Sequence, residues 1–586
     1  SPGSINNTTP NKEHAAKTGP GIPAWVADAR WYYLELGRFF NAEPANDPSS
    51  VSPWTPEGSP GSDGEARSGP GAKAFGTHTP DQSVYGGDLQ GLIVRLAYLE
   101  ELGVNALILD PIFLGSTAFP WLTRDLRHVD DAFGTKDSLR QIHGESEDPA
   151  SWQFSATDRL FIEFVDKAHA RGLRVVLNGL FGDQGRGVAG HKMSDSHALA
   201  VTRRWMDPNG DGDPSDGVDG WLVSMPTTLP DAWWLAWAAQ VKKINPNAIL
   251  ILRDATGGAT PAVSAAFDAA VNVRTSLAIR DFFRPRDDPS VGSAVRTSTL
   301  QRWFDDLGNH FGPKAGRRRF ANLNLFSGLM GPRLVTLLQV KAPTLAASAF
   351  SPTRKPLEPI LDRWRLATIV QHFCPGAPVT YYGDEVGMYG LCKPWRRPPM
   401  WWPDLADPAS KPQNYRGDLL ALVHWLHQQR ERYAPLRHGE FRPVLLDEEH
   451  RIFAFARSLP GDEVILVVNY GKTKQKVVLP AGKPGQLVGV LSPQIKPPPL
   501  RAKAVQGKNV RRPGPVRPPA AGQNASVMAD AETTTGRANG APGYSRIRRL
   551  RMGGSRQFVN AQGRIVLWVN PMSIRVVLVN DKEPRR

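Results

Sequence analysis

Ser224 lies at a position where a side chain could act on a substrate. It ends the apolar run 220–224 within the stretch DGVDGWLVSMP. The run follows a turn-rich segment and precedes a proline, which is typical of a short buried parallel strand. A serine is a weak nucleophile unless a base activates it. No G-x-S-x-G elbow surrounds Ser224 and no histidine lies near it in the sequence, so we predict a small polar residue that fills a strand end.

The acidic stretch DPNGDGDPSDG at 207–217 is a second candidate site. Asp207, Asn209 and Asp211 have the spacing of the first half of a calcium-binding loop. The bidentate glutamate expected at the twelfth position of such a loop is Val218 here. The stretch therefore favours a tight turn, with a calcium site on these three side chains as the alternative. The sequence indicates no other cofactor.

Short apolar runs that alternate with longer amphipathic segments must position these residues. Eight runs predict strands: 31–36, 104–110, 173–179, 220–224, 248–254, 267–272, 322–326 and 378–382. Helical patterns at 89–103, 160–172 and 231–244 lie between them. Repeated βα units over about 400 residues predict an α/β fold, a (β/α)8 TIM barrel with insertions. The alternative is a doubly wound open sheet, for which the glycine-rich phosphate fingerprint is missing.

After about residue 432 the pattern changes to short strands with turn signals, which predicts a C-terminal antiparallel β-sandwich. The expected organisation is a flexible segment at 1–22, a barrel at 23–432 and a β-domain at 433–586. A Pro- and Arg-rich insertion at 493–549 has no acidic residue before Asp530. Long loops inside compact domains are unusual without a role, so we predict an arm that binds an acidic partner. A solvated loop is the alternative.

Composition narrows the class of protein. The chain has 586 residues, which are too many for one ordinary core, and a net charge of +15, which favours acidic partners. No apolar run is long enough for a transmembrane segment, and no motif predicts specific nucleic-acid binding.

Cys374 and Cys392 flank the predicted strand 378–382, too far apart for a disulfide, so we predict free thiols. Because the chain does not begin with Met, an exported location is favoured over the cytoplasm.

Several segments resemble, in chain order, the α-amylase family (glycoside hydrolase family 13), and within it the neopullulanases and cyclomaltodextrinases. YGGDLQGLIVRLAYLEELGVNALILDPIF at 85–113 is similar to the first barrel segment, and DAFGT, WMDPNGDGDPSDGVDGW, PGAPVTYYGDEVGMYG and RRPPMWW extend the match. The resemblance covers residues 24–440. It implies an active site at the carboxyl ends of the barrel strands and retaining glycoside hydrolysis by two carboxyl groups about 5 Å apart.

The positions that carry catalysis in the family all hold other residues here. In the second-strand loop, Trp121 and Leu122 replace a Tyr–Asp pair, and in the third-strand motif Asn178, Gly182 and Asp183 replace Asp, Asn and His. In the fourth-strand motif, Leu222 replaces the Arg and Ser224 replaces the nucleophilic Asp. In the fifth-strand motif Arg253 or Asp254 replaces the general-acid Glu, and in the seventh Leu329 and Met330 replace His and Asp. Because several replacements are apolar, a lone carboxylate beside them would be costly to bury.

The resemblance and these substitutions together imply an inactive α-amylase-like protein, a structural, assembly or carbohydrate-binding subunit. We expect a protein partner or a second copy of the chain, or an α-glucan held by Trp121, Trp221 and Asp254. The alternative is an active α-glucan hydrolase or transglycosidase with a rewired site. In an inverting version, Asp254 would be the acid and Asp183 the base, about 6.5–9.5 Å apart.

Overall fold

The computed structural model describes residues 22–48, 51, 84–115, 123–179, 181, 195–224, 229–253, 260–283, 300–311, 317–327, 333–339, 358–389, 397–404, 415–493, 547 and 552–579. The predicted segment 1–22 and the predicted arm at 493–549 fall almost entirely outside these residues. Within them, no helix has both the length and the apolar character needed to cross a membrane.

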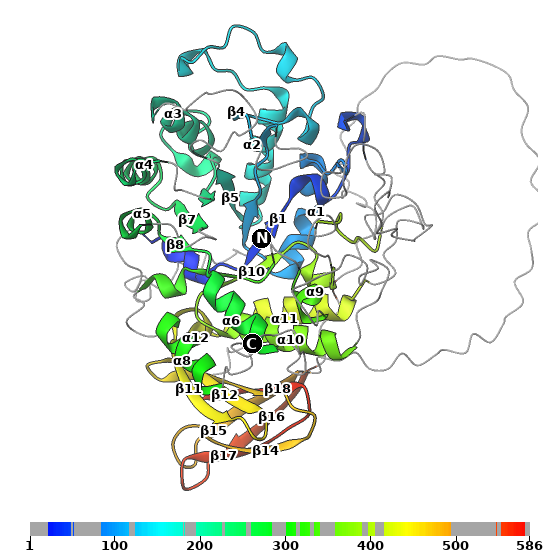
Figure 1. Cartoon of the computed structure of the whole chain (residues 1–586), viewed down its shortest axis with the longest axis vertical. Helices are drawn as coiled ribbons and strands as arrows, with labels where there is room; N and C mark the ends of the chain where they lie inside the picture. The colour runs from blue at the N-terminus through cyan, green and yellow to red at the C-terminus, as the bar shows by residue number, and fades with distance from the viewer. Residues whose placement is uncertain are drawn as a thin grey trace, which may run out of the picture.

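Eight parallel strands form one sheet in the first part of the chain (Figure 1). They are β1 (Trp31–Leu34), β2 (Ala106–Leu109), β5 (Arg174–Gly179), β6 (Gly220–Ser224), β7 (Ile249–Arg253), β8 (Ala269–Ala270), β9 (Leu323–Leu325) and β10 (Ala377–Tyr381). Neighbours in this series pair in parallel, except β8 and β9, and β1 also pairs with β10. A parallel bridge from Val271, next to β8, to Leu323 of β9 joins the two remaining edges. The sheet therefore closes, which confirms the predicted TIM barrel and all eight predicted strands.

Helices surround the barrel because its strands are apolar on both faces. The helices are α1 (Leu89–Leu102), α2 (Ala156–His169), α3 (Asp195–Met206), α4 (Asp231–Ile244), α5 (Pro261–Ala266), α6 (Val273–Phe283), α8 (Leu300–Phe311), α9 (Leu334–Gln339), α10 (Glu358–Phe373), α11 (Gly417–Arg432) and α12 (Ala434–His438). Local sequence sets several ends. Asp88 caps the start of α1, and Gly103 ends that helix in the left-handed conformation, at φ +85°.

The segment between β2 and α2 leaves the barrel at the carboxyl end of β2. It contains the hairpin β3 (Phe113–Leu114) and β4 (Asp125–Val129), and three short 3-10 helices, Asp131–Phe133, Leu139–Gln141 and Pro149–Ser151. Because it follows the carboxyl end of a barrel strand, this segment lies on the face where barrel enzymes keep their active sites.

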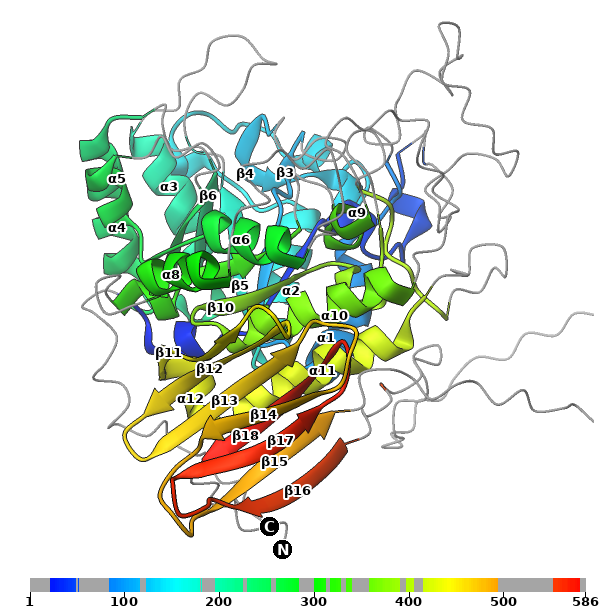
Figure 2. The ribbon, with the colours of Figure 1, turned by 60° about the horizontal axis from the view of Figure 1, so that its bottom comes forward.

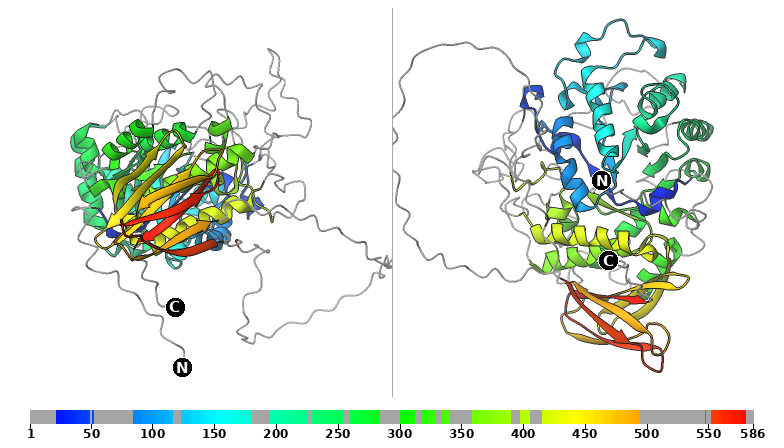
Figure 3. Two further views of the ribbon diagram at one scale, coloured as in Figure 1. Left: turned by 90° about the horizontal axis from the view of Figure 1, so that it is seen from below. Right: turned by 180° about the vertical axis from the view of Figure 1, so that it is seen from behind.

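The C-terminal strands form two antiparallel layers, which confirms the predicted β-sandwich class (Figure 2). The larger sheet has the order β11 (Glu440–Asp447), β12 (Ile452–Leu459), β13 (Asp462–Asn469), β18 (Ser573–Val579), β15 (Leu487–Pro493), β16 (Met552–Phe558). The second layer is a ribbon of β14 (Gln475–Pro480) and β17 (Arg564–Val569). Their facing side chains form a separate apolar core. These strands lie beside the barrel, next to α8 and α12 (Figure 3).

Cys374 and Ile547 are both buried in the barrel region of the molecule. Cys374 is a buried free thiol, and burial raises its pKa to about 12, whereas Cys392 lies outside the described residues. Ile547, near the end of the insertion, is buried against the barrel core, and its backbone N–H donates to Glu101 of α1 at 2.8 Å. The returning end of the insertion is therefore anchored on the barrel.

Candidate active site

The carboxyl ends of five barrel strands bring five polar side chains together, which we call the floor network. Its members are Tyr33 of β1, Asp110 directly after β2, Asn178 of β5, Ser224 of β6 and Arg253 of β7. Parallel pairing sets Asn178 level with Leu222, and Ser224 level with Arg253. Carboxyl ends of neighbouring parallel strands share one edge, so these side chains lie close together although they are far apart in sequence.

Hydrogen bonds connect the floor network in a chain. The Ser224 hydroxyl donates to Asn178 Oδ1 at 3.2 Å, and Asn178 Nδ2 donates to Asp110 Oδ1 at 3.1 Å. The Tyr33 hydroxyl also donates to Asp110 Oδ1. On the other side, the Arg253 guanidinium donates to the Tyr33 oxygen at 2.7 Å. The chain therefore runs from a serine through an amide to a single carboxyl group.

Asp110 is the only carboxyl group of the floor network. It is 2% exposed, and its Oδ2 has no hydrogen-bond partner. Burial, reinforced by the negative charge of Glu35, raises its pKa to about 6, although Arg253 and the donors Tyr33 and Asn178 act in the opposite direction. A buried carboxyl group of this kind is half protonated near pH 6 and has little access to a substrate.

Ser224 has no base to activate it within the floor network. Its hydrogen-bond acceptor, the Asn178 amide oxygen, does not take up a proton at ordinary pH, whereas a nucleophilic serine needs a base within hydrogen-bond reach. The interpretation of Ser224 as a small polar residue that fills a strand end stays a prediction.

The fifth strand contributes a cation to the floor. β7 ends at Arg253, whose side chain joins the floor network, while Asp254 lies outside the described residues. Burial lowers the pKa of Arg253, but the neighbouring Tyr33 and Asp110 raise it by more, so the guanidinium stays charged. An arginine that stays charged does not release a proton and so cannot act as a general acid.

Apolar side chains occupy other predicted site positions. Leu222 is fully buried. Trp221 is also fully buried, with its ring 6.5 Å from that of Phe113 and 5.2 Å from that of Phe181. As it stands, Trp221 presents no ring face to a ligand and is a core residue. Trp121, Leu122, Gly182, Asp183, Leu329 and Met330 lie outside the described residues.

Glu35, directly after β1, is a second buried carboxylate near the floor. Burial raises its pKa, but Arg397 and Arg38 lower it by more, and both Arg397 and the Tyr381 hydroxyl donate to it. Since its oxygens are held by these donors, Glu35 serves as a structural anion.

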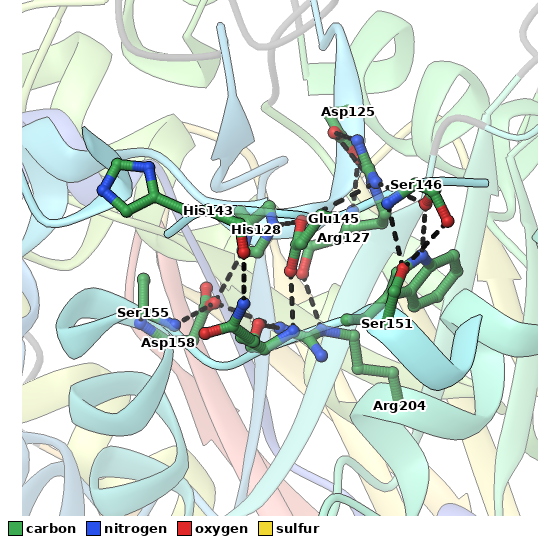
Figure 4. A network of polar contacts seen from close by, with 12 residues as sticks. Asp125, Arg127, His128, His143, Glu145, Ser146, Ser151, Ser155, Asp158 and Arg204 are labelled. Atoms are coloured by element: carbon green, nitrogen blue, oxygen red, sulfur yellow. Dashed lines mark hydrogen bonds and ion pairs between the residues drawn. The ribbon is translucent and has the colours of Figure 1, made fainter. Parts of the chain in front are cut away.

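A second polar cluster, which we call the clamp, joins the segment after β2 to α2 and α3 (Figure 4). His128 of β4 is buried between two carboxylates: Nδ1 lies 2.8 Å from Asp158 Oδ2 and Nε2 lies 2.9 Å from Glu145 Oε2. Because carboxylates accept hydrogen bonds, both ring nitrogens must donate, which requires the protonated imidazolium. Burial lowers the pKa of His128, but Asp158 and Glu145 raise it by more, so the net shift is upward.

Two arginines complete the clamp. Arg204 of α3 donates to Asp158 Oδ2 at 3.2 Å, and Arg127 of β4 lies 3.6 Å from Glu145 Oε2. Asp158 also accepts from the backbone N–H of Ser155, at the start of α2, at 2.9 Å. The clamp joins β4, the loop around Glu145, α2 and α3. With both nitrogens engaged, His128 has none left to act as a base or to bind a metal ion.

The acidic stretch at 207–217 forms a turn in which its side chains cap backbone N–H groups. Asp207 accepts from Gly212 at 3.2 Å, Asn209 from Asp211 at 2.9 Å, and Asp211 from Asp213 at 2.7 Å. This is the tight turn that the sequence favours. In the described part of the chain, no group of three or more His, Cys, Asp or Glu side chains is placed to hold a metal ion, and calcium binding stays a prediction from spacing.

Two floor residues, Tyr33 and Asp110, are missing from the sequence-based candidates. Asp110 had a readable signal, because it is the one carboxylate that directly ends the apolar run 104–110. Tyr33 lies inside an aromatic run with no such mark. The clamp residues were also missed, because their contacts join positions as distant as Asp158 and Arg204.

Several known proteins are similar to this chain in sequence. A family model described as "Alpha amylase, catalytic domain" matches residues 38–148, which include Asp110 and most of the clamp. The chain is 26% identical to neopullulanase 2 of Thermoactinomyces vulgaris over 514 residues, 79% of this chain and 73% of that protein. It is 26% identical to a cyclomaltodextrinase of a Bacillus species over 499 residues, 77% of this chain and 74% of that protein. The chain is therefore similar to these proteins over more than three quarters of its length, and its residues 38–148 resemble the α-amylase catalytic domain.

Solved structures agree on the fold. The ligand-free cyclic α-maltosyl-(1→6)-maltose hydrolase of Arthrobacter globiformis matches with a TM-score of 0.54 and 22% identity over 78% of this α-amylase-like chain and 94% of that one. A cyclomaltodextrinase matches with a TM-score of 0.58 and 23% identity over 81% and 74% of the two chains.

Proposed function

We propose that this α-amylase-like chain has no glycosidase activity and serves as a carbohydrate-binding or assembly subunit. The observation that carries the proposal is the hydrogen bond from Ser224, the residue that the sequence resemblance aligns with the family's nucleophile, to Asn178. Retaining hydrolysis needs two carboxyl groups about 5 Å apart, one as nucleophile and one as acid. The floor network offers a serine bonded to an amide, a charged arginine and one buried carboxyl group.

The proposal is tested by incubating the purified chain with maltooligosaccharides, cyclodextrin and pullulan and measuring new reducing ends. We expect none above the background of a mock purification. The double variant Leu222→Arg/Ser224→Asp, run alongside, restores the family's residue types at two of the changed positions. We expect it to remain inactive too, because Arg253 still occupies the floor.

A rewired hydrolase is the second candidate, and the raised pKa of Asp110 favours it. A carboxyl group that is protonated near pH 6 is suited to be a general acid. Turnover that Asp110→Asn, Asp254→Asn or Asp183→Asn abolishes, and that Asp213→Asn in the exposed acidic turn leaves intact, would replace the inactive-subunit proposal with this one.

The partner that we propose is a protein or a second copy of this chain, with an α-glucan as the ligand. Light scattering on the purified protein measures its oligomeric state. Electrophoresis in gels that contain amylopectin measures glucan binding as retardation. A monomer that amylopectin does not retard would contradict the subunit role.

A further inference from the structure

Charge is divided unevenly along the chain. Residues 433–586 contain 26 Lys and Arg against 10 Asp and Glu, whereas residues 1–432 contain 45 against 46. The C-terminal region therefore has a net charge of +16 and the rest of the chain is nearly neutral. An anionic partner is attracted to the C-terminal domain rather than to the barrel.

The outer face of the β14–β17 ribbon is both apolar and basic. The inward side chains of the two strands pack into the sandwich core, and the outward ones remain exposed. Val478 and Val566 are cross-strand partners and are 45% and 42% exposed, and Trp568 beside them is 53% exposed. Exposed apolar side chains that adjoin one another on a sheet indicate a contact surface rather than scattered surface residues.

Cations surround this apolar strip. Lys476 is the cross-strand partner of Trp568, Lys474 Nζ lies 5.2 Å from the centre of the Trp568 ring, and Arg564 is exposed at the other end of β17. Neither strand of the ribbon contains an acidic residue. The exposed acidic residues Glu448 and Glu449 belong to the turn between β11 and β12 of the larger sheet.

We propose that the outer face of the β14–β17 ribbon docks on an anionic lipid surface. Lysines and an arginine pair with anionic headgroups, while a tryptophan and two valines enter the boundary between headgroups and acyl chains. Tryptophan is suited to that boundary because its ring is apolar and its N–H is polar. A nucleic acid or an acidic polysaccharide would satisfy the cations but would leave the valines without an apolar environment. A neutral glucan would leave the cations without counter-charges.

The sequence of the insertion adds to the same attraction. It begins directly after β15 of this domain, and residues 494–529 contain seven Lys and Arg and no acidic residue. Basic residues near an anionic membrane each add about a fivefold increase in binding. The inference does not depend on whether the barrel is inactive.

The test is co-sedimentation of the full chain with vesicles of phosphatidylcholine alone or with 30% phosphatidylserine. We expect binding to the serine-containing vesicles only, weakened by salt. Trp568→Ala should weaken it about tenfold and Lys474→Gln/Lys476→Gln by about fivefold per lysine. Matched controls are Phe558→Ala, an aromatic residue that is 74% exposed on β16, and Lys243→Gln on α4 of the barrel, both expected to bind like the unaltered chain.

Three results would overturn the proposal. The first is no binding to either vesicle. The second is binding that the ribbon variants leave unchanged, which would assign the attraction to the insertion alone. The third is binding of the chain to insoluble starch that Trp568→Ala abolishes, in the absence of vesicle binding. Thermal unfolding of each variant checks that it folds, and these exposed positions should leave the melting temperature unchanged.

Discussion

The floor network and the clamp are two buried polar clusters on the same face of the barrel, and they differ in how charge is balanced. In the clamp, His128 lies between two carboxylates, each of which also faces an arginine. In the floor network, one carboxyl group faces mostly neutral donors and keeps an oxygen without a partner. The same face therefore combines a fully paired structural cluster with a network whose one carboxyl group is incompletely paired.

This difference explains which cluster maintains the fold. Removing one partner from a paired buried cluster leaves opposite charges unpaired, which is costly. Removing the carboxyl group from the floor network relieves one incompletely paired buried charge, at the cost of a nearby counter-charge for Arg253. Four variants test the contrast, and they are ordered from the largest expected effect to the smallest.

Asp158→Ala should destabilise the protein by about 3–5 kcal/mol, because it removes the buried anion that Arg204 and His128 Nδ1 share and one half of the capping box of α2. Urea unfolding measures the change. The control is Glu163→Ala on the same helix, whose exposed pair with Lys167 should contribute less than about 1 kcal/mol. Equal losses in the two variants would show that the clamp has no special role.

The free energy of unfolding of Asp110→Asn, relative to that of the unaltered chain, should increase as pH rises. The folded-state pKa of about 6 lies above the ordinary value of 3.8, so the folded state holds its proton more tightly and loses stability between about pH 4 and 7. The variant lacks that loss. The difference in free energy of unfolding between variant and parent should increase by on the order of 2 kcal/mol from pH 4.5 to pH 7.5. A difference independent of pH would contradict the raised pKa of Asp110.

His128→Gln should have the opposite pH dependence. Because the pKa of His128 is raised in the folded state, its stabilisation is fully present below about pH 6.5 and is lost as pH rises through the folded-state pKa. We expect the variant to cost about 2 kcal/mol at pH 6 and less at pH 9. The measurement is urea unfolding at the two pH values, and His450→Gln, at an exposed histidine, is the control. A cost that grows with pH would show that His128 is not an imidazolium.

Ser224→Ala should have the smallest effect, a loss of no more than about 1 kcal/mol, because it removes one neutral hydrogen bond from a half-buried hydroxyl. Any trace of reducing-end release should be unaltered. Loss of a measurable activity in this variant alone would make Ser224 a nucleophile and would contradict the contrast.

The barrel could be predicted from the sequence because each of its strands is a nearly continuous apolar run. Strands 487–493 and 552–558 of the C-terminal sheet, like strand 440–447, were not predicted. The first adjoins the Pro-rich insertion, and the second, MGGSRQF, has two glycines and no apolar alternation, so it is a strand because β15 pairs with it along its whole length. Pairing across a long insertion leaves no local signal.

The candidate site was predictable only where a family motif marked it. Ser224, Leu222 and Asn178 lie at the strand positions that the motifs imply. No motif residue was considered on the strand that holds Tyr33, and after the second strand only Trp121 and Leu122 were considered, not Asp110. The parallel pairing of β1 with β2 and of β2 with β5 brings Tyr33 and Asp110 next to Asn178. The choice between Arg253 and Asp254 depended on strand register, and the pairing of Arg253 with Ser224 assigns Arg253 to the floor.

β18 lies between β13 and β15, although it is the last strand of the described chain. During translation, residues 462–469 and 487–493 leave the ribosome well before residues 573–579, with the insertion still to be made. In that interval β13 and β15 each present an unpaired edge to other nascent chains. The barrel strands are all synthesised earlier, so a chain stalled in the insertion is a completed barrel joined to an unfinished, aggregation-prone half-sheet, the stage at which chaperone protection matters most.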